Sequence, residues 1–332
     1  MGITIFPYGL AIAAAAAVAL ILAAAGFRRA GLSGDALSLF AVLALPLGFL
    51  GGRLGYCLAA WDWVKQEGIS FFFQFSRGGY MFYGALAGGL LAAALAAKGS
   101  GERFPKLADA LAVPMLVLVA LGRLAEGLVE QGYGWGIADW FTEDYGMSLF
   151  ALEDPSFFYR LPFGVPDMYG NHNWAVFVFE ALVACGLAFV VSRASVRREG
   201  GRAALALLLY AATQELGESL RQDAVLRWGF VRVNQVLGAV VIVTLLALCY
   251  ALARPRKPAR LALSAVEVVV GALLVTAMEF ALEKKFSALE WVPMDVCYVF
   301  SAVGCLIMIL AVRPLWRAAF GRGAAREEEA VC

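Results

Sequence analysis

The sequence has 332 residues, of which 62% are hydrophobic and only 16% are charged, and its mean hydropathy is +0.76. A soluble globular domain carries about a quarter charged residues, so this composition indicates an integral membrane protein. The formal net charge of +1 gives no support to a nucleic-acid partner.

Runs of about 20 apolar residues, the length that crosses the hydrocarbon core of a bilayer, predict nine transmembrane helices. In chain order they lie near residues 7–27, 36–60, 80–98, 107–128, 174–192, 203–222, 232–252, 261–281 and 293–312. The first run is too long for a signal peptide and no basic segment precedes it, so we expect it to remain as a helix. The expected fold class is therefore an all-α polytopic membrane helix bundle.

Charged residues in the loops predict the orientation. Lysines and arginines gather in alternate loops, at 28–29, 98–106, 193–202 and 254–260, and after residue 312. The segment 129–173, between two of these loops, is instead rich in acids: Glu130, Asp139, Glu143, Asp144, Glu153, Asp154 and Asp167. Because short cytoplasmic loops carry the excess of basic residues, we expect the N-terminus outside and the C-terminus in the cytoplasm.

A metal site or another cofactor is not expected. The cysteines show no metal-ligand spacing, and His172 is the single histidine of the chain. All but the last of the cysteines lie in apolar runs, and we interpret them as packing residues: Cys57, Cys185, Cys249, Cys297, Cys305 and Cys332. The glycine pairs at 51–52, 78–79 and 88–89 are expected to let helices approach closely.

Charged residues inside the apolar runs indicate a site near the outer face of the membrane. Each costs about 2.5–3.5 kcal/mol at the centre of a bilayer, even on the mildest scale. With the predicted orientation, they all fall toward the outer ends of their helices, where Tyr8 also begins the first one. These residues are Arg53, Arg123, Glu126, Glu215, Glu218 and Arg221.

Two motifs allow two interpretations each. Gln214, Glu218 and Arg221 share one helix face, where they form either a functional group or a neutralising Glu218–Arg221 ion pair. Arg123, three residues before Glu126, either clamps a phosphodiester or extends to the interface as a snorkelling side chain. Arg53 lies deeper among apolar neighbours, so we expect it to need an anionic partner.

The order of the motifs resembles the bacterial prolipoprotein diacylglyceryl transferase family. The resemblance covers about residues 5–252 and rests on YGLAIA at 8–13, GGRLGY at 51–56, GGYMFYGALAGG at 78–89, Asp109-x₄-Pro114, LGRLAEGLVEQGYG at 121–134, Glu180, YAATQELGESLRQD at 210–223 and NQVLG at 234–238. It implies a seven-helix inner-membrane enzyme that moves diacylglycerol from phosphatidylglycerol to the lipobox cysteine of a preprolipoprotein.

Site residues follow from the resemblance position by position. Tyr8, Arg123, Gly134, Glu218 and Arg221 match functional residues of the family. The chain departs at four others: Tyr83 replaces the family histidine, Glu126 a signature asparagine, Gln131 a signature glutamate and Gln214 an arginine. Arg53 or Arg221 is expected to support Arg123 on the lipid phosphate.

Thioether formation requires a base, because the thiolate and not the thiol is the nucleophile. Tyr83 and Glu126 are the two candidates, and both stay open at the level of sequence.

The resemblance implies a bacterial plasma-membrane protein with a transferase-like core at 1–252 and a two-helix extension with a cytoplasmic tail at 253–332. Its expected partners are an anionic phospholipid, phosphatidylglycerol, and the signal peptide of a preprolipoprotein. The alternative is a catalytically silent relative that binds phospholipid or lipoprotein. A transporter is disfavoured because the inner halves of the helices lack charged residues to line a path, with Asp109 as the main exception.

Overall fold

The computed structural model describes residues 6–75, 78–141, 152, 154–222, 226–228, 231–253, 258–285 and 287–321. Part of the charge pattern used for the orientation lies outside these ranges, as does Cys332: Glu143, Asp144, Glu153, Arg254, Arg256, Lys257, Arg322 and Arg326.

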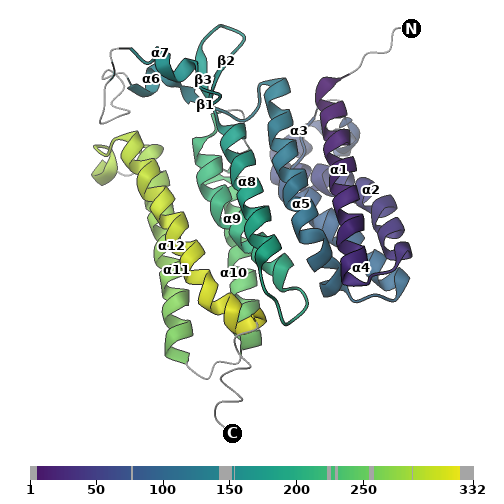
Figure 1. Cartoon of the computed structure of the whole chain (residues 1–332). Helices are drawn as coiled ribbons and strands as arrows, with labels where there is room; N and C mark the ends of the chain where they lie inside the picture. The colour runs from purple at the N-terminus through teal and green to yellow at the C-terminus, as the bar shows by residue number, and fades with distance from the viewer. Residues whose placement is uncertain are drawn as a thin grey trace, which may run out of the picture.

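Nine long helices make up the bundle in the described part of the chain, one for each predicted apolar run (Figure 1). They are α1 (Pro7–Ala30), α2 (Gly34–Ala59), α4 (Phe82–Ser100), α5 (Phe104–Glu126), α8 (Val176–Arg193), α9 (Gly201–Leu220), α10 (Val233–Ala253), α11 (Pro258–Leu282) and α12 (Met294–Phe320). Eight of them are long and apolar enough to cross a membrane. The exception is α9, whose second half carries Gln214, Glu215 and Glu218. The predicted all-α polytopic fold is confirmed.

The predicted end of the last helix was wrong. The apolar run stops near residue 312, but α12 continues to Phe320 through Arg313 and Pro314. The added turns are amphipathic, and their apolar side chains, among them Leu315 and Trp316, are buried against α9. Packing on a neighbouring helix therefore extends α12 beyond the length that the membrane alone requires.

Short elements that the sequence did not predict lie mainly between the long helices at one end of the bundle. A three-stranded antiparallel sheet has the order β1-β3-β2, and β4 pairs with β5 in a small hairpin. Figure 1 shows this sheet at the end of the bundle where α1 begins, whereas α12 ends at the opposite side. We call this the sheet end. Its elements are α3 (Trp61–Glu67), η1 (Ile69–Phe73), η3 (Gly127–Val129), β1 (Tyr133–Gly136), α6 (Ile137–Phe141), α7 (Ser156–Tyr159), β2 (Gly164–Pro166), β3 (His172–Ala175), β4 (Arg227–Trp228), β5 (Val231–Arg232) and η5 (Ser287–Leu289).

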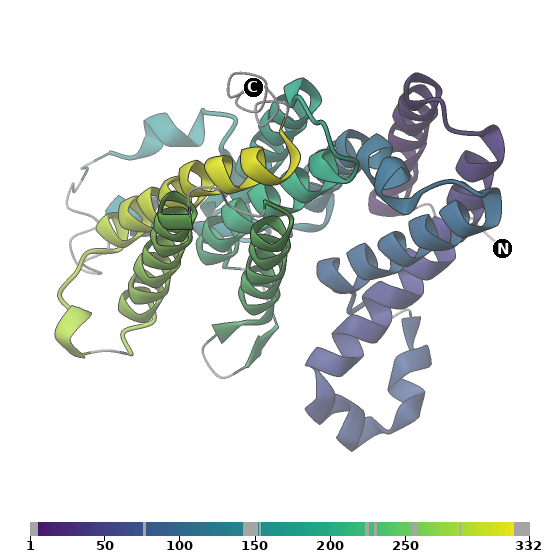
Figure 2. The ribbon, with the colours of Figure 1, turned by 90° about the horizontal axis from the view of Figure 1, so that it is seen from below.

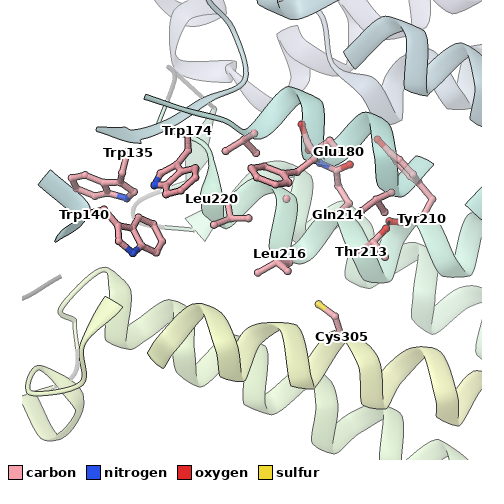
Figure 3. A pocket seen from close by; sticks show the side chains of 14 residues that line it. Trp135, Trp140, Trp174, Glu180, Tyr210, Thr213, Gln214, Leu216, Leu220 and Cys305 are labelled. Atoms are coloured by element: carbon pink, nitrogen blue, oxygen red, sulfur yellow. Dashed lines mark hydrogen bonds between the residues drawn. The ribbon is translucent and has the colours of Figure 1, made fainter. Parts of the chain in front are cut away.

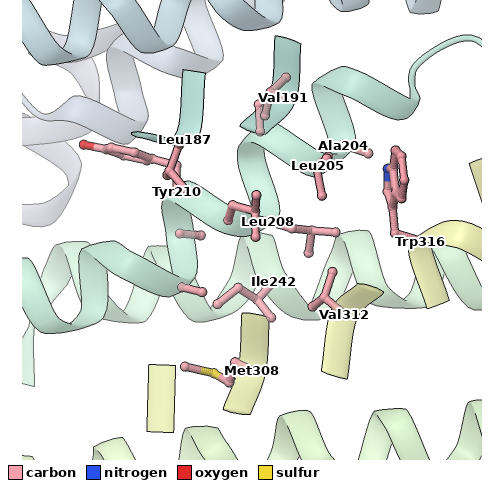
Figure 4. Packing of buried hydrophobic residues seen from close by; sticks show 14 of the residues in the cluster. Leu187, Val191, Ala204, Leu205, Leu208, Tyr210, Ile242, Met308, Val312 and Trp316 are labelled. Carbon is pink, nitrogen blue, oxygen red and sulfur yellow. The ribbon is translucent and has the colours of Figure 1, made fainter. Parts of the chain in front are cut away.

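The two larger apolar cores in the described residues each join several helices, and α5 contributes to both. The first joins α1, α2, α4 and α5 through small residues such as Ala23 and Ala96, with Phe27 between them. The second joins α5, α8, α9, α10, α11 and α12, and Figure 4 shows part of it, with Leu208 and Met308 on facing helices. Seen from below in Figure 2, the α2–α4 pair and the α11–α12 pair lie on opposite sides of the molecule.

Glycines let α2 and α4 touch through their backbones. A Cβ at Gly88 would meet the carbonyl oxygen of Leu47, and one at Gly55 would lie 3.0 Å from Cα of Gly84. This is the close approach predicted from the glycine pairs at 51–52 and 88–89. The pair at 78–79 acts differently: both glycines have positive φ, and neither lies in a helix.

Candidate functional site

Arg123 lies in the last turn of α5, at the sheet end, and its side chain turns into the bundle. Its Nη1 donates a hydrogen bond to Oε1 of Glu126 at 2.8 Å, and Nη2 makes longer contacts with the hydroxyl of Tyr210 (3.4 Å) and Oε1 of Gln214 (3.3 Å). Arg123 is only 9% exposed. The snorkelling interpretation was therefore wrong, because polar partners inside the bundle satisfy the guanidinium without contact with the interface.

Arg221 reaches the same cluster from another helix. It caps the C-terminal end of α9, and its Nη1 donates to Oε2 of Glu126 at 2.9 Å and to Oε2 of Glu180 at 3.2 Å. Glu180 comes from α8 and also lies 3.5 Å from Nε of Arg123. Two carboxylates thus bridge the two arginines, and three helices converge on one charged centre. We call Arg123, Glu126, Glu180, Gln214, Glu218 and Arg221 the charged cluster.

Gln214 and Glu218 connect the rest of the charged cluster. Nε2 of Gln214 donates to Oε1 of Glu180 and to Oε1 of Glu218, both at 3.0 Å. Oε1 of Glu218 also accepts a hydrogen bond from Nδ2 of Asn234 at 2.9 Å. Its second oxygen, Oε2, is buried and has no hydrogen-bond partner among the described residues. A buried carboxylate oxygen of this kind can accept a hydrogen bond from a ligand or from an ordered water.

The other predicted binding residues lie around this centre. Tyr8, in the first turn of α1, is close enough to interact electrostatically with Glu126 and both arginines. Gly134 in β1 is a contact point between elements, since a Cβ there would lie 2.8 Å from the side chain of Val176. The side chain of Gln131 is exposed in the turn after α5.

Tyr83 occupies a separate position at the start of α4. Its ring is 5.3 Å from that of Phe82, and its buried hydroxyl has no hydrogen-bond partner in the described chain. A Cβ at Gly238 would lie 2.9 Å from this hydroxyl and 2.8 Å from Oε1 of Glu215. The tyrosine hydroxyl and a carboxylate oxygen therefore both lie against Gly238.

Arg53 lies outside the charged cluster, and the expectation of an anionic partner was wrong. Its guanidinium donates to backbone carbonyls at 71–79, among them those of Phe72 at 3.0 Å and Gly79 at 3.1 Å, with a short contact to Gly78. It also lies over the ring of Phe71, 4.9 Å from the centroid. Several carbonyl dipoles and an aromatic face satisfy the cation without a carboxylate or a phosphate. Arg53 holds the loop between η1 and α4.

An apolar pocket borders the charged cluster, with a volume of about 410 Å³. Figure 3 shows Glu180, Gln214 and Tyr210 at one end of the pocket and three tryptophans at the other. The tryptophans are Trp135, Trp140 and Trp174 from the sheet end. Pockets of about 300–1,000 Å³ with apolar walls and a few polar groups are typical of small-molecule sites. The arrangement suits a ligand with a polar headgroup and an apolar chain.

Sequence analysis did not assign a role to several residues of the site. Glu180 is a single acid within the apolar run VFVFEALVA, and that isolation is the signal that points to it. Tyr210 and Asn234 gave no comparable signal, since tyrosine and asparagine are uncharged and common in helices. Only the convergence of α5, α9 and α10 brings Tyr210 to Arg123 and Asn234 to Glu218.

Helices that cross a membrane and a charged cluster inside their bundle define a polytopic membrane protein with an internal polar site. The family model of prolipoprotein diacylglyceryl transferase matches residues 1–251, so the chain belongs to this family. The match ends within α10, and α11 and α12 lie beyond it. The membrane helices and the family support a bacterial plasma-membrane protein.

Relatives from several bacteria carry the name phosphatidylglycerol–prolipoprotein diacylglyceryl transferase. The protein from Listeria innocua is 27% identical over 71% of this chain and 81% of its own length. Those from Symbiobacterium thermophilum and Shouchella clausii are both 28% identical, over 75% and 74% of this chain and 89% and 85% of their own lengths.

Proposed function

We propose that the protein transfers the diacylglyceryl group of phosphatidylglycerol to the lipobox cysteine of a prolipoprotein. The observation that carries the proposal is the meeting of Arg123 and Arg221 in one buried cluster, in a chain that belongs to this family. The apolar pocket beside that cluster suits an acyl chain, and the relatives named above act on these two substrates by their names.

The reaction forms a thioether and releases glycerol phosphate. The cysteine sulfur, as a thiolate, bonds to the glyceryl carbon that carries the phosphate. The bond between this carbon and the phosphate oxygen breaks, and its electron pair leaves with glycerol phosphate. A base takes the thiol proton.

The arginines bind the phosphate and stabilise the charge of the leaving group. The guanidinium of Arg123 is planar and offers several donors, and its Nη2 has contacts of 3.3 and 3.4 Å, near the outer limit of a hydrogen bond. That nitrogen can donate a hydrogen bond to a phosphate oxygen and lose only these two weak contacts. Glu126 and Glu180 keep both guanidinium groups in place before the lipid binds.

Glu218 gives the site a preference for a headgroup with hydroxyls. Its free Oε2 is a buried acceptor, and a glycerol headgroup offers a hydroxyl donor for it. Tyr8 closes the site from the side of α1. The base is Tyr83 or Glu126, and the two are separated by the substitutions in the Discussion.

The experiment that tests the function uses purified protein in detergent. Phosphatidylglycerol and a lipobox peptide are the substrates, and mass spectrometry detects the diacylglyceryl peptide. Growth of a strain depleted of its own transferase is the cellular counterpart. Correctly inserted protein that yields neither product nor growth, but retains phosphatidylglycerol, contradicts the proposal and identifies a phospholipid-binding relative.

We further propose that the sheet end faces outward, that the C-terminus is cytoplasmic, and that residues 253–332 are an extension of the core at 1–252. Loop 193–202, with its basic residues, lies at the opposite end of the bundle from the sheet.

Cysteine labelling of intact cells tests this orientation, with the native cysteines replaced. We expect Tyr169→Cys, at an exposed position before β3, to react with a membrane-impermeant maleimide, and Ser195→Cys to react only after the membrane is opened. Labelling of Ser195→Cys in intact cells would invert the orientation.

A further inference from the structure

The functional end of α9 needs support, because a helix leaves its last carbonyl groups without partners inside the helix. Glu218 lies in the last turn of α9, and Arg221 is the first residue after that helix. Arg232 of β5 donates to the carbonyl of Arg221 at 2.9 Å and to that of Ser219 at 3.4 Å, with a short contact to the carbonyl of Glu218. A buried arginine thus caps the helix end on which the charged cluster depends.

Two side chains from the helices beyond the family match continue this support. The hydroxyl of Tyr298 in α12 donates to the carbonyl of Ser219 at 3.1 Å. Glu279 in α11 accepts a hydrogen bond from Nε2 of Gln235 at 2.8 Å, and the same amide group lies 3.1 Å from both the Ser219 Oγ and the carbonyl of Glu215. The Tyr298 contact thus ends directly on Ser219, and Glu279 reaches Ser219 and Glu215 through the amide of Gln235.

α12 runs antiparallel to α9 and holds it at both ends. At the end away from the sheet, the indole of Trp316 donates to the carbonyl of Gly201, the first residue of α9, at 2.7 Å. Between this contact and that of Tyr298, apolar side chains of the two helices pack in one core, in which Figure 4 shows Trp316, Val312 and Met308 near Leu205 and Leu208. Of these two hydrogen bonds, that of Tyr298 lies next to the charged cluster and that of Trp316 lies at the far end.

We propose that α11 and α12 are a brace for α9, and that Tyr298 and Glu279 are positioning residues for Glu218 and Arg221. The brace fixes the angle at which α9 ends and therefore the distance from Arg221 to Glu126 and Glu180. The proposal rests on the proposed function for its effect on turnover, whereas its structural part can be measured without any activity.

The test compares the two ends of the same helix pair. Tyr298→Phe removes one hydroxyl at the cluster end and keeps the ring stacked on Trp140, whose centroid is 5.3 Å away. Trp316→Phe is the matched control at the opposite end. In hydrogen–deuterium exchange of the full-length protein, we expect Tyr298→Phe to speed exchange at 216–222 by about two- to tenfold, the size of one hydrogen bond, and to leave 201–208 unchanged. Trp316→Phe should speed exchange at 201–208 and leave exchange at 216–222 unchanged.

Turnover separates a positioning role from a purely structural one. We expect Tyr298→Phe to lower kcat by about tenfold or more, since small displacements of substrate-binding groups are costly, and Trp316→Phe to leave kcat unchanged. We expect Glu279→Leu to lower kcat by the same factor. Glu279→Gln keeps the acceptor oxygen and should therefore keep most of the wild-type kcat. Glu267→Leu, at an exposed position of α11, is the matched control and should have no effect.

The outcomes are distinguishable. Unchanged exchange at 216–222 in both Tyr298→Phe and Glu279→Leu overturns the brace, whether or not the protein is a transferase. Faster exchange there with unchanged kcat overturns the positioning role. A wild-type protein without transferase activity refutes the proposed function, while the exchange measurement still decides whether the brace exists.

Discussion

Replacing Arg123 with lysine should lower kcat/KM for diacylglyceryl transfer by about a hundredfold or more. The planar guanidinium lies within contact distance of Glu126, Glu180, Tyr210 and Gln214, and an ammonium group is a single point charge that can reach only some of them. It also cannot bind a phosphate through two parallel hydrogen bonds. Arg123→Ala should lose all measurable transfer. The measurement is the rate of thioether formation on a lipobox peptide as a function of phosphatidylglycerol concentration.

The control for this prediction must separate lost chemistry from lost folding. Breaking a buried ion pair destabilises a protein by about 3–5 kcal/mol in soluble cases, so thermal unfolding in detergent should be measured in parallel. Arg103→Lys changes an exposed arginine that pairs with Glu199 at 2.7 Å on the opposite side of the bundle, and it should keep full activity. Transfer at the wild-type rate by Arg123→Ala would refute a phosphate-binding role.

The sequence predicted the helices well because their signal is local. A span needs about 20 apolar residues in a row, and each of the nine runs became a helix with bounds shifted by a few residues. α12 is the exception, since its extra turns depend on contacts with α9 that are distant in sequence. The short strands at the sheet end were missed for a different reason: two to four residues carry too little pattern to be distinguished from a loop.

The site was only partly predictable. The charges in apolar runs identified Arg123, Glu126, Glu218 and Arg221, because each is too costly to place in a membrane without a partner. A single sequence does not show which residues these charged side chains contact. Arg221 bonds to Glu126 and Glu180 on other helices, and Arg53 uses backbone carbonyls, which every residue has and no sequence pattern marks.

The structure bears most directly on which residue is the base that takes the thiol proton. The resemblance makes Tyr83 and Glu126 the two candidates, but the hydroxyl of Tyr83 lies against Gly238, with Oε1 of Glu215 against the same glycine. Glu126, the other candidate, already accepts a hydrogen bond on each oxygen, from Arg123 at 2.8 Å and from Arg221 at 2.9 Å. Each oxygen of Glu126 keeps a second lone pair that can take a proton, whereas Tyr83 can act as a base only after it has lost its own phenolic proton.

If Tyr83 is the base, Tyr83→Phe lowers kcat for transfer by about 10²-fold or more, the usual size of a general-base contribution, and Glu126→Gln is mild. Tyr83→Phe keeps the ring that packs on Phe82 and removes only the hydroxyl. Gly238→Ala provides an independent check, because its methyl group would come too close to the Tyr83 hydroxyl and to Glu215 and should cause a comparable loss by displacing the intact tyrosine. Single-turnover rates with the lipobox peptide measure the chemical step.

The reverse pattern of kcat losses in the two variants would identify Glu126 as the base. A large loss in Glu126→Gln with little change in Tyr83→Phe means that a carboxylate held between two arginines takes the thiol proton, and that its bonds to Arg123 or Arg221 open when the lipid phosphate arrives to replace them. Mild effects of both substitutions, in a protein that transfers, would remove both candidates. Glu215 and Glu218 would then be the carboxylates to test, because each has a buried oxygen without a hydrogen-bond partner among the described residues and so retains an acceptor for a proton.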